Sequence, residues 1–298
     1  MAHTHVDDFA RIMAQVAPYM SSSIPRMLDR FGPNWETRFG ETLARLYPDG
    51  GEALEKAVRG YVRFALDATR LQKRFEKELR YIAKTYEEAA NAVYQNREYM
   101  HELYLPGILL SHYLWPHHYR QLEWFLEHYI PLVEAAQDQR FYDIGMGTGY
   151  YSRIMLTQAP GCQGLAVDVS AFSIAFSTKH IEAFGLAERW SWIKRDILRK
   201  PLGETRPFLL NVEVLEHLED PVAFLKGLRG LLAPGGYGFI TAAINAPNED
   251  HIYLYRDCGE VMAQLEEAGF QVVNHLDERA YEPKADESVP SLGAFIVK

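Results

Sequence analysis

From residue 140 to the end of the chain, short apolar runs alternate with helix-like segments, and this alternation constrains the fold more than any other feature. Parallel strands joined by helical crossovers produce such a pattern. We expect strands at residues 140–145, 164–169, 190–194, 208–214, 237–243, 270–276 and 293–298. Helices are expected after Tyr150 and at residues 171–184, 221–232 and 257–268. This part is therefore predicted to be an α/β domain with a Rossmann-like, seven-stranded, doubly wound sheet, whose last two strands form a hairpin-like pair.

The first part of the chain has apolar residues at three- and four-residue spacing and no strand-like alternation, which indicates helices. This periodicity covers residues 7–20, 35–47, 51–72 and 74–104, and a further helix is expected from Pro116 to about Ala136. Proline and glycine predict helix breaks at Pro25 and at residues 31–35, 47–51 and 105–107. The predicted organisation is an all-helical domain at residues 1–138, followed by the α/β domain at residues 139–298.

The composition argues against several classes of protein. The 298 residues are 48% hydrophobic and 24% charged, as in an ordinary globular protein. A formal net charge of −9 disfavours a nucleic-acid partner, because such affinity comes from clustered Lys and Arg. Cys162 and Cys258 are far apart and show no CxxC or Cys/His zinc spacing, so neither a disulfide framework nor a structural zinc site is expected.

The N-terminal segment, MAHTHVDDFARIM, carries acidic residues where a secretory signal peptide would carry basic ones. No apolar run approaches the ~20 residues that a helix needs to span a bilayer. We therefore expect a cytoplasmic protein without a membrane partner.

A glycine-rich loop follows the first predicted strand, with Gly145, Gly147 and Gly149 at alternate positions. Such a loop lets the backbone approach a ligand at the start of a helix. The dinucleotide fingerprint is G-x-G-x-x-G, so the third glycine comes one position too early for that ligand. Asp143 precedes the loop, and a carboxylate there would repel a pyrophosphate but attract an amino group and a sulfonium. The loop therefore disfavours a nicotinamide cofactor.

Acidic residues also end the next two predicted strands. Asp168, followed by Val169, stands where an acid can accept hydrogen bonds from both hydroxyls of a ribose. Asp196 and Ile197 follow the third strand, where a carboxylate can bind an exocyclic amino group and an aliphatic side chain can cover an adenine ring. These four residues are predicted to hold the nucleoside half of the ligand.

The order and separation of five motifs resemble the class I S-adenosylmethionine-dependent methyltransferases. These motifs are the D-x-G-x-G-x-G loop, the acids after strands two and three, NVEVLEHLEDP, and LLAPGGYGFIT. Among that class the chain is most similar to the ubiquinone-type small-molecule methyltransferases, and the resemblance runs from about residue 140 to the end. It implies S-adenosyl-L-methionine as the cofactor, with the three glycines around its methionine part and Asn211 near its sulfonium. Met146 departs from the Gly, Cys or Ala that is common in this loop.

Three residues near the strand tips are candidates for acid–base catalysis. Glu213 ends the fourth strand and His217 follows four residues later, so both can face the crevice. His251 lies in the loop after strand five, where similar methyltransferases carry a histidine. For each of the three, a purely structural role in holding its loop remains the alternative.

Candidate substrate-binding residues come from two segments. Tyr113, His117 and Tyr119 belong to HYLWPHHYRQ, which we interpret as a lid segment, while Asn245 and Tyr255 flank His251. The histidines of the lid segment lack metal-ligand spacing, so no metal site is expected.

We therefore expect methyl transfer to an O, N or C atom of a small molecule of secondary metabolism, with the helical domain closing the crevice. A homo-oligomer through the helical domain is a further expectation. C-methylation of a 2-oxo acid is a sub-case of this small-molecule hypothesis. The alternatives are methylation of a protein or carrier-bound substrate and a non-catalytic cofactor-binding protein.

Overall fold

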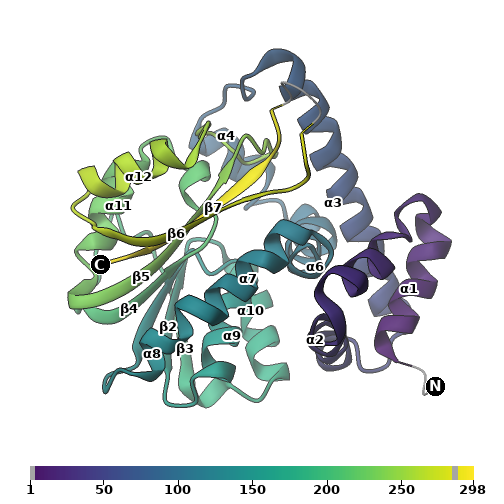
Figure 1. Ribbon diagram of the computed structural model, residues 1–298, viewed down its shortest axis with the longest axis horizontal. Helices are drawn as coiled ribbons and strands as arrows, with labels where there is room; N and C mark the ends of the chain where they lie inside the picture. The colour runs from purple at the N-terminus through teal and green to yellow at the C-terminus, as the bar shows by residue number, and fades with distance from the viewer. Residues whose placement is uncertain (1–3, 284–287) are drawn as a thin grey trace.

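The protein is described by a computed structural model that covers residues 4–283 and 288–298, and its C-terminal part is built on one seven-stranded sheet (Figure 1). The strand order is β3-β2-β1-β4-β5-β7-β6. The strands are β1 (Arg140–Ile144), β2 (Gln163–Asp168), β3 (Trp190–Lys194), β4 (Arg206–Asn211), β5 (Leu232–Ile244), β6 (Val272–Arg279) and β7 (Ser291–Val297). The first five strands pair parallel with one another, and β7 pairs antiparallel with both β5 and β6. The predicted doubly wound sheet with a final antiparallel pair is confirmed.

Helices cover both faces of the sheet. Successive residues of a strand point to opposite faces, so neighbouring side chains contact different sets of helices. On β1, Phe141 joins the core with α7, α9 and α10, whereas Tyr142 joins the core with α11 and α12. In Figure 1 these two sets of helices lie on opposite sides of the strands. Their bounds are α7 (Pro116–His128), α9 (Tyr150–Gln158), α10 (Ala171–Ala183), α11 (Pro221–Arg229) and α12 (Cys258–Glu267).

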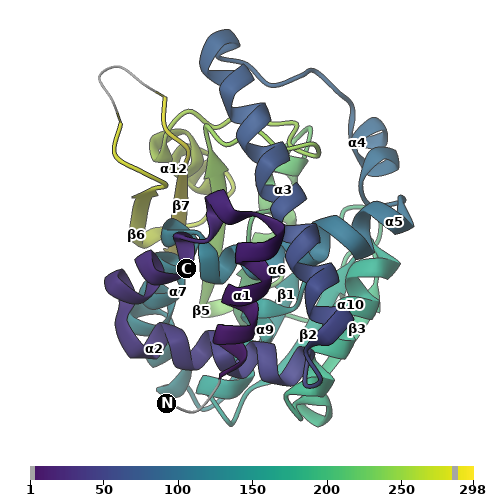
Figure 2. The same cartoon turned by 90° about the vertical axis from the view of Figure 1, so that its right-hand side faces the viewer.

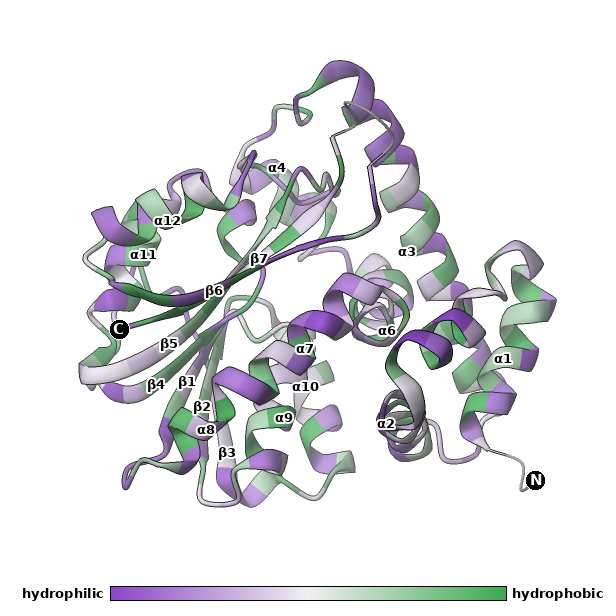
Figure 3. Ribbon diagram, in the orientation of Figure 1, coloured by the Kyte–Doolittle hydropathy of each residue, from purple (hydrophilic) through white to green (hydrophobic). Residues whose placement is uncertain are grey.

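The N-terminal helices form a separate layer beside the sheet domain (Figure 1). They are α1 (His5–Val16), α2 (Ser23–Leu46), α3 (Gly51–Glu78), α4 (Tyr86–Ala92), α5 (Arg97–Tyr99) and α6 (Leu105–Leu114). Leu54, Val58 and Tyr61 of α3 recur every three or four residues and are all buried. Figure 3 shows hydrophilic and hydrophobic stretches in turn along these helices, as expected of helices that bury one face.

Two expectations for this region are wrong. Residues 74–104 are not one helix, because α3 ends where Leu79 adopts a left-handed backbone (φ 48°) and further gaps separate α4 and α5. The predicted break at residues 105–107 is a helix start, since a π-helical turn, Met100–Tyr104, runs directly into α6 and Pro106 lies in the first turn of α6. In Figure 2 the chain leaves the end of α3 and passes through α4 and α5 before it reaches α6.

The helix α7 and the short α8 (Ile130–Glu134) precede the sheet in sequence but pack on it. The ring of Phe125 lies 4.7 Å from the ring of Phe239 in β5, and the Tyr129 hydroxyl donates to the carbonyl oxygens of Leu209 and Tyr237. The division of the chain at residue 138 stays a prediction. Within the described part of the chain, no helix has the length and apolar character to cross a membrane.

Candidate cofactor and acceptor site

The carboxyl ends of the parallel strands open into a cavity of about 1080 Å³ that the helical domain covers. Its sheet side includes Ile144, Val167 and Val212. Its helical side includes Tyr61 and Phe64 of α3, several other side chains of α3 and α6, and Trp115, which directly follows α6. Ligands of open α/β sheets bind at this edge. The cavity is as large as those that hold a drug-sized ligand, and it spans both parts of the chain.

The glycine loop forms one wall of the cavity. Gly145, Gly147 and Gly149 have φ values of 74°, 51° and 70°, a left-handed backbone that favours glycine. A Cβ atom on Gly145 would also lie 2.5 Å from Cγ2 of Val214. Gly145 and Gly147 line the cavity, while Gly149 begins α9 against Ser177. The loop is thus a turn with a left-handed backbone that packs against Val214 and Ser177.

Asp143 and Asp168, the acids at the ends of β1 and β2, both line the cavity and are buried. Asp143 accepts a 2.6 Å hydrogen bond from the Ser152 hydroxyl, and burial raises its pKa to about 7. Asp168 accepts hydrogen bonds from the backbone N–H groups of Gly147 and Ser170, at 3.2 and 2.8 Å. Burial raises the pKa of Asp168 to about 6. Asp168 therefore ties the glycine loop to β2 and keeps carboxylate lone pairs at the cavity wall.

The predicted adenine-binding residues also reach the cavity. Asp196 and Ile197 line it, and Val169 lines it beside Asp168. One oxygen of Asp196 accepts from the backbone N–H groups of Leu198 and Arg199, which holds this turn in place. Asn211 differs from the rest. It is fully buried, is not among the lining residues, and donates to the Ile144 carbonyl oxygen, so it joins β4 to β1.

Glu213 lines the cavity just after β4 and has a positive φ of 51°. A non-glycine residue with this backbone is strained, and such strain is typical of functional sites. Its backbone N–H donates to the Thr241 hydroxyl, while its Oε1 has no hydrogen-bond partner among the described residues. Burial raises the pKa of Glu213 to about 7. Glu213 is thus a carboxyl group at the cavity wall that can exchange a proton near neutral pH.

His217 also lines the cavity, and its orientation is fixed by Asp250. Nδ1 of His217 lies 3.2 Å from the Asp250 carbonyl oxygen and 3.3 Å from its Oδ2, so this nitrogen carries the proton and donates. Burial acts to raise the pKa of Asp250, but His217, His251 and two tyrosine hydroxyls outweigh it and lower that pKa. These tyrosines are Tyr94 and Tyr104 of the helical domain, whose hydroxyls donate to Oδ2 of Asp250.

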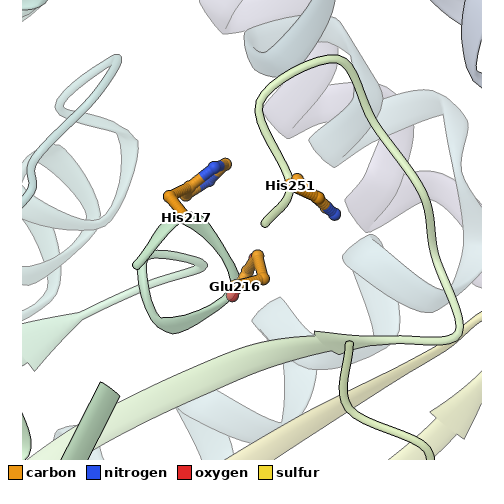
Figure 4. A group of neighbouring side chains, drawn as sticks. All are labelled: Glu216, His217 and His251. Atoms are coloured by element: carbon orange, nitrogen blue, oxygen red, sulfur yellow. The ribbon is translucent and has the colours of Figure 1, made fainter. Parts of the chain in front are cut away.

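His251 lies on the loop after β5, beside the turn after β4 that carries His217 (Figure 4), and the centres of the two rings are 4.9 Å apart. Its Nδ1 is 2.6 Å from the Ala246 carbonyl oxygen, to which it donates. Burial lowers the pKa of His251 to about 3, so the ring is neutral. The remaining nitrogen, Nε2, is available on a side chain that lines the cavity.

Glu216 lies beside His217 and His251, and it was not predicted from the sequence as a site residue. It is fully buried, and neither carboxylate oxygen has a hydrogen-bond partner of ordinary geometry among the described residues. Burial and the nearby Glu213 raise the pKa of Glu216 well above its usual value, and the backbone N–H groups of Glu216 and Ala243 offset this only in part. Asp250 was also missed. Both are acids in polar-looking segments, and the sequence carries no direct signal of their burial.

The structure places the five predicted substrate residues in different surroundings. His117 lines the cavity, whereas the other four are not among its lining residues. Tyr113 is buried against Thr42 and Arg153, and Tyr119 packs on Phe31. The side chain of Asn245 donates to the Arg256 carbonyl oxygen, and the Tyr255 hydroxyl donates to Gln264. Aromatic residues that do line the cavity, such as Tyr86 and Tyr94, lie in the segment after α3 and share the helical periodicity of core residues.

Comparisons with known proteins agree with this site. Residues 142–238 match a family model described as a methyltransferase domain. Over 121 residues the chain is 36% identical to a ubiquinone biosynthesis O-methyltransferase of Parvibaculum lavamentivorans, covering 41% of this chain and 46% of that protein. The corresponding enzyme of Cereibacter sphaeroides strain KD131 is 36% identical over 97 residues, which is 33% of this chain and 38% of that protein. The chain thus spans less than half the length of these curated relatives.

A solved O-methyltransferase family protein from Burkholderia thailandensis has a TM-score of 0.51 at 13% identity, covering 81% of this chain and 71% of that one. This likeness supports the fold alone. Fold, glycine loop and family match together define a Rossmann-like methyltransferase domain. More narrowly, the chain contains a class I methyltransferase domain, the type that uses S-adenosylmethionine as methyl donor, as the motifs from Asp143 onward predict.

Proposed function

We propose that this chain transfers a methyl group from S-adenosylmethionine to a small-molecule acceptor held in the same cavity. The observation that carries the proposal is the continuity of that cavity. Its walls include the glycine loop and Asp168, then Glu213 and His217, and also apolar side chains of the helical domain. A cofactor subsite therefore opens directly onto space for an acceptor.

The residues at the strand tips fit the cofactor. Glycine backbone at residues 145 and 147 leaves room for its methionine part, and the carboxylates of Asp143 and Asp168 can accept hydrogen bonds from an amino group and from ribose hydroxyls. Asp196 and Ile197 lie where the adenine would be held. When bound, the cofactor supplies an electrophilic methyl group and leaves as S-adenosylhomocysteine.

In the proposed reaction, the chain positions the acceptor and removes its proton. Positioning supplies most of the rate in a direct displacement, because the two reacting atoms must be held in line. Glu213 has an unpartnered carboxylate oxygen at the cavity wall and a pKa of about 7, so we assign it as the base that takes a proton from the acceptor. The similarity to O-methyltransferases favours an oxygen nucleophile. A role in secondary metabolism, a cytoplasmic location and a homo-oligomer through the helical domain stay predictions.

Two steps test the proposal. First, the melting temperature is measured with S-adenosylmethionine and with NAD, and we expect a rise with the former only. Second, the protein is incubated with methyl-labelled S-adenosylmethionine and a library of hydroxylated small molecules, and label is followed by mass spectrometry. Stabilisation by NAD alone would refute the cofactor assignment. Cofactor binding without labelled product from any library member, or with labelled protein instead, would contradict the small-molecule assignment.

A further inference from the structure

We propose that the acceptor enters the cavity between the helices α2 and α3 and the β6–β7 pair, and that it is an elongated aromatic molecule with an anionic group at its far end. Arg26 and Lys73, which line the cavity at this entrance, bind the anionic group. The assignment of this space to an acceptor rests on the proposed function. The entrance, the two recognition residues and the class of compound go beyond that function.

The cavity reaches the surface at two places, because its exposed lining residues fall into two groups. The first group is Tyr86, Val169, Leu198, Arg199, Glu219 and Asp220, at the ends of β2, β3 and β4. The second group is Tyr19, Arg26, Thr69, Lys73 and Tyr281, around the start of α2, one face of α3 and the end of β6. The edge strands of the sheet are β3 and β6, six strand spacings or about 29 Å apart. In Figure 2, β6 and β7 lie on one side of α3, whereas α4 and β3 lie on the other.

The cofactor subsite accounts for the first opening. Asp168 and Asp196, which we assign to the ribose and the adenine, follow β2 and β3 and line the cavity there. Tyr86 of α4 lies near both acids. Burial is the main cause that raises the pKa of its hydroxyl, and the charges of Asp196 and Asp168 raise it further. A bound cofactor would therefore fill this end, and the second opening is left for the acceptor.

One face of α3 forms a wall of the second opening. Its lining residues recur at three- and four-residue spacing, which places them on the same side of the helix. Two of them, Ala65 and Ala68, have small side chains and leave width for a ligand. Gln72 donates a 3.3 Å hydrogen bond to the Ser288 carbonyl oxygen, so this wall contacts the segment that precedes β7. The lining residues of this face are Ala65, Ala68, Thr69, Gln72, Lys73 and Glu76.

Flat rings form another part of the helical wall. Phe64 stacks on Trp115, with ring centres 5.6 Å apart and an angle of 20° between the ring planes. Trp115 stacks in turn on His117, at 5.7 Å and 17°. Burial lowers the pKa of His117 to about 3, so this ring is neutral. All three rings line the cavity, and aromatic ligands pack well on such rings. This wall therefore favours an acceptor whose middle part is aromatic and uncharged.

Arg26 and Lys73 make the second opening positively charged. Neither forms an ion pair with an acid of the described residues, whereas Arg74, next to Lys73, pairs with Glu78. Glu76 is the one acid among the described residues that line this opening, so the two cations outnumber it. An anionic group of the acceptor would complement this charge.

The guanidinium of Arg26 lies close to the cavity wall. Its Nε donates to the Ser22 carbonyl oxygen at 3.1 Å. Burial raises the pKa of Tyr61, which lines the cavity, and the charge of Arg26 acts on this pKa in the opposite direction. The acids at the cofactor end suit a cationic sulfonium and would repel an anion. The charges of the cavity thus orient an anionic acceptor with its charged group at the second opening and its nucleophile toward the methyl group.

The test uses the full chain and two fluorescent probes with the same rings. These are 8-anilinonaphthalene-1-sulfonate, which is anionic, and N-phenyl-1-naphthylamine, which is its neutral analogue. We expect the parent to bind one molecule of either probe. Combined Arg26→Gln and Lys73→Gln substitutions should weaken binding of the anionic probe by about 3- to 30-fold and that of the neutral probe by less than about twofold. The matched control combines Arg63→Gln and Lys77→Gln, which remove the same charge from exposed positions of α3 that do not line the cavity.

Ala68→Trp narrows the opening, so it should weaken the binding of both probes and leave the affinity for S-adenosylhomocysteine unchanged. Circular dichroism shows whether each variant is folded. In the labelling experiment, hydroxylated aromatic acids should have a higher kcat/KM than their methyl esters, and the combined Arg26 and Lys73 substitutions should remove this preference.

Several results would overturn the second opening as an anion site. These are no probe binding to the parent, an unchanged affinity of the folded double variant for the anionic probe, an equal loss for both probes, or displacement of the probe by S-adenosylhomocysteine. A preference for the methyl esters would overturn the anionic acceptor. The proposed function survives these results if S-adenosylmethionine still binds and label is transferred. Conversely, the predicted probe binding without any cofactor binding would remove the proposed function and keep the anion site.

Discussion

The hydroxyl of Tyr104 donates a 2.6 Å hydrogen bond to the carboxylate of Asp250, which joins the helical domain to the loop after β5. The same carboxylate contacts Nδ1 of His217 at the cavity wall. The helical domain therefore does more than cover the cavity. It helps to set the position of a side chain at the site.

Replacing Tyr104 with phenylalanine removes one donor from a fully buried carboxylate. We expect the free energy of unfolding to fall by about 1–3 kcal/mol, as for other buried groups that lose a partner. Denaturant unfolding measures this change. Tyr99→Phe is the control, because the Tyr99 hydroxyl makes no hydrogen bond to the described residues and its loss should change stability by less than about 0.5 kcal/mol. Equal effects of the two substitutions would show that the Tyr104–Asp250 bond contributes nothing.

The raised pKa of Asp143 predicts a pH-dependent effect of Asp143→Asn. Burial raises this pKa from 3.8 to about 7, so between these pH values the folded protein binds a proton that the unfolded chain does not. The contribution of Asp143 to stability therefore falls as pH rises through this window. Asparagine at this position has no charge to bury. The free energy of unfolding of Asp143→Asn, relative to that of the parent, should therefore rise by up to about 4 kcal/mol from pH 4 to pH 8.

Asp138→Asn should show the opposite sign. Arg140 lowers the pKa of Asp138, so the favourable contribution of this carboxylate is present above its unfolded pKa and is lost in acid. Thermal melts across the pH range separate the two cases. A pH-independent difference for Asp143→Asn would mean that Asp143 is not buried as an acid.

Alanine variants of Gly145 and Gly235 separate the destabilisation due to backbone strain from that due to tight packing. Both have a positive φ, but a Cβ atom on Gly145 would meet Val214 at 2.5 Å, whereas nothing lies within 4 Å of a Cβ atom on Gly235. Alanine at either position carries a strain of about 1–2 kcal/mol. Gly145→Ala should cost about 1–3 kcal/mol more, because the core must move. Similar unfolding midpoints for the two variants would contradict the tight packing of the loop.

Glu213→Gln tests the assignment of the base. With an acceptor found by the labelling experiment, we expect the single-turnover rate to fall by about 10²–10⁴-fold while the affinity for S-adenosylmethionine stays the same. Glu219→Gln is a matched control at the same cavity, where the amide oxygen can still accept from the backbone of Tyr86. An unchanged rate for Glu213→Gln would assign proton removal to another group or to the acceptor itself.

The strands, the helices between them and the glycine turn could be predicted from the sequence, because each depends on local patterns. Apolar runs define β1 and β2, and the glycines and acids at their ends fall at fixed offsets. The end of α3 before Leu79 was missed because a leucine with a left-handed backbone has no sequence signature. Pro106 was misinterpreted, since a proline that follows a helix and one that begins a helix look alike in sequence.

The acceptor side was harder to predict, because it depends on which side chains the tertiary fold brings together. Tyr113 and Tyr255 have the residue type of a ligand pocket, but they are core residues with partners of their own. Glu216 and Asp250 lie 34 positions apart in sequence, and their shared burial beside His217 appears only once β4 and β5 are paired. Sequence spacing does not show such a cluster.

Titration with S-adenosylhomocysteine in a calorimeter tests the central claim most directly, by comparing the parent chain with Asp168→Ala. The account predicts one binding site in the parent and a loss of affinity of about 10–100-fold in the variant, because hydrogen bonds to a charged group contribute about 1.5–3 kcal/mol. Asp49→Ala, at an exposed turn, should bind as the parent does. No binding by the folded parent, or equal affinity in Asp168→Ala, would contradict a cofactor site at the end of β2.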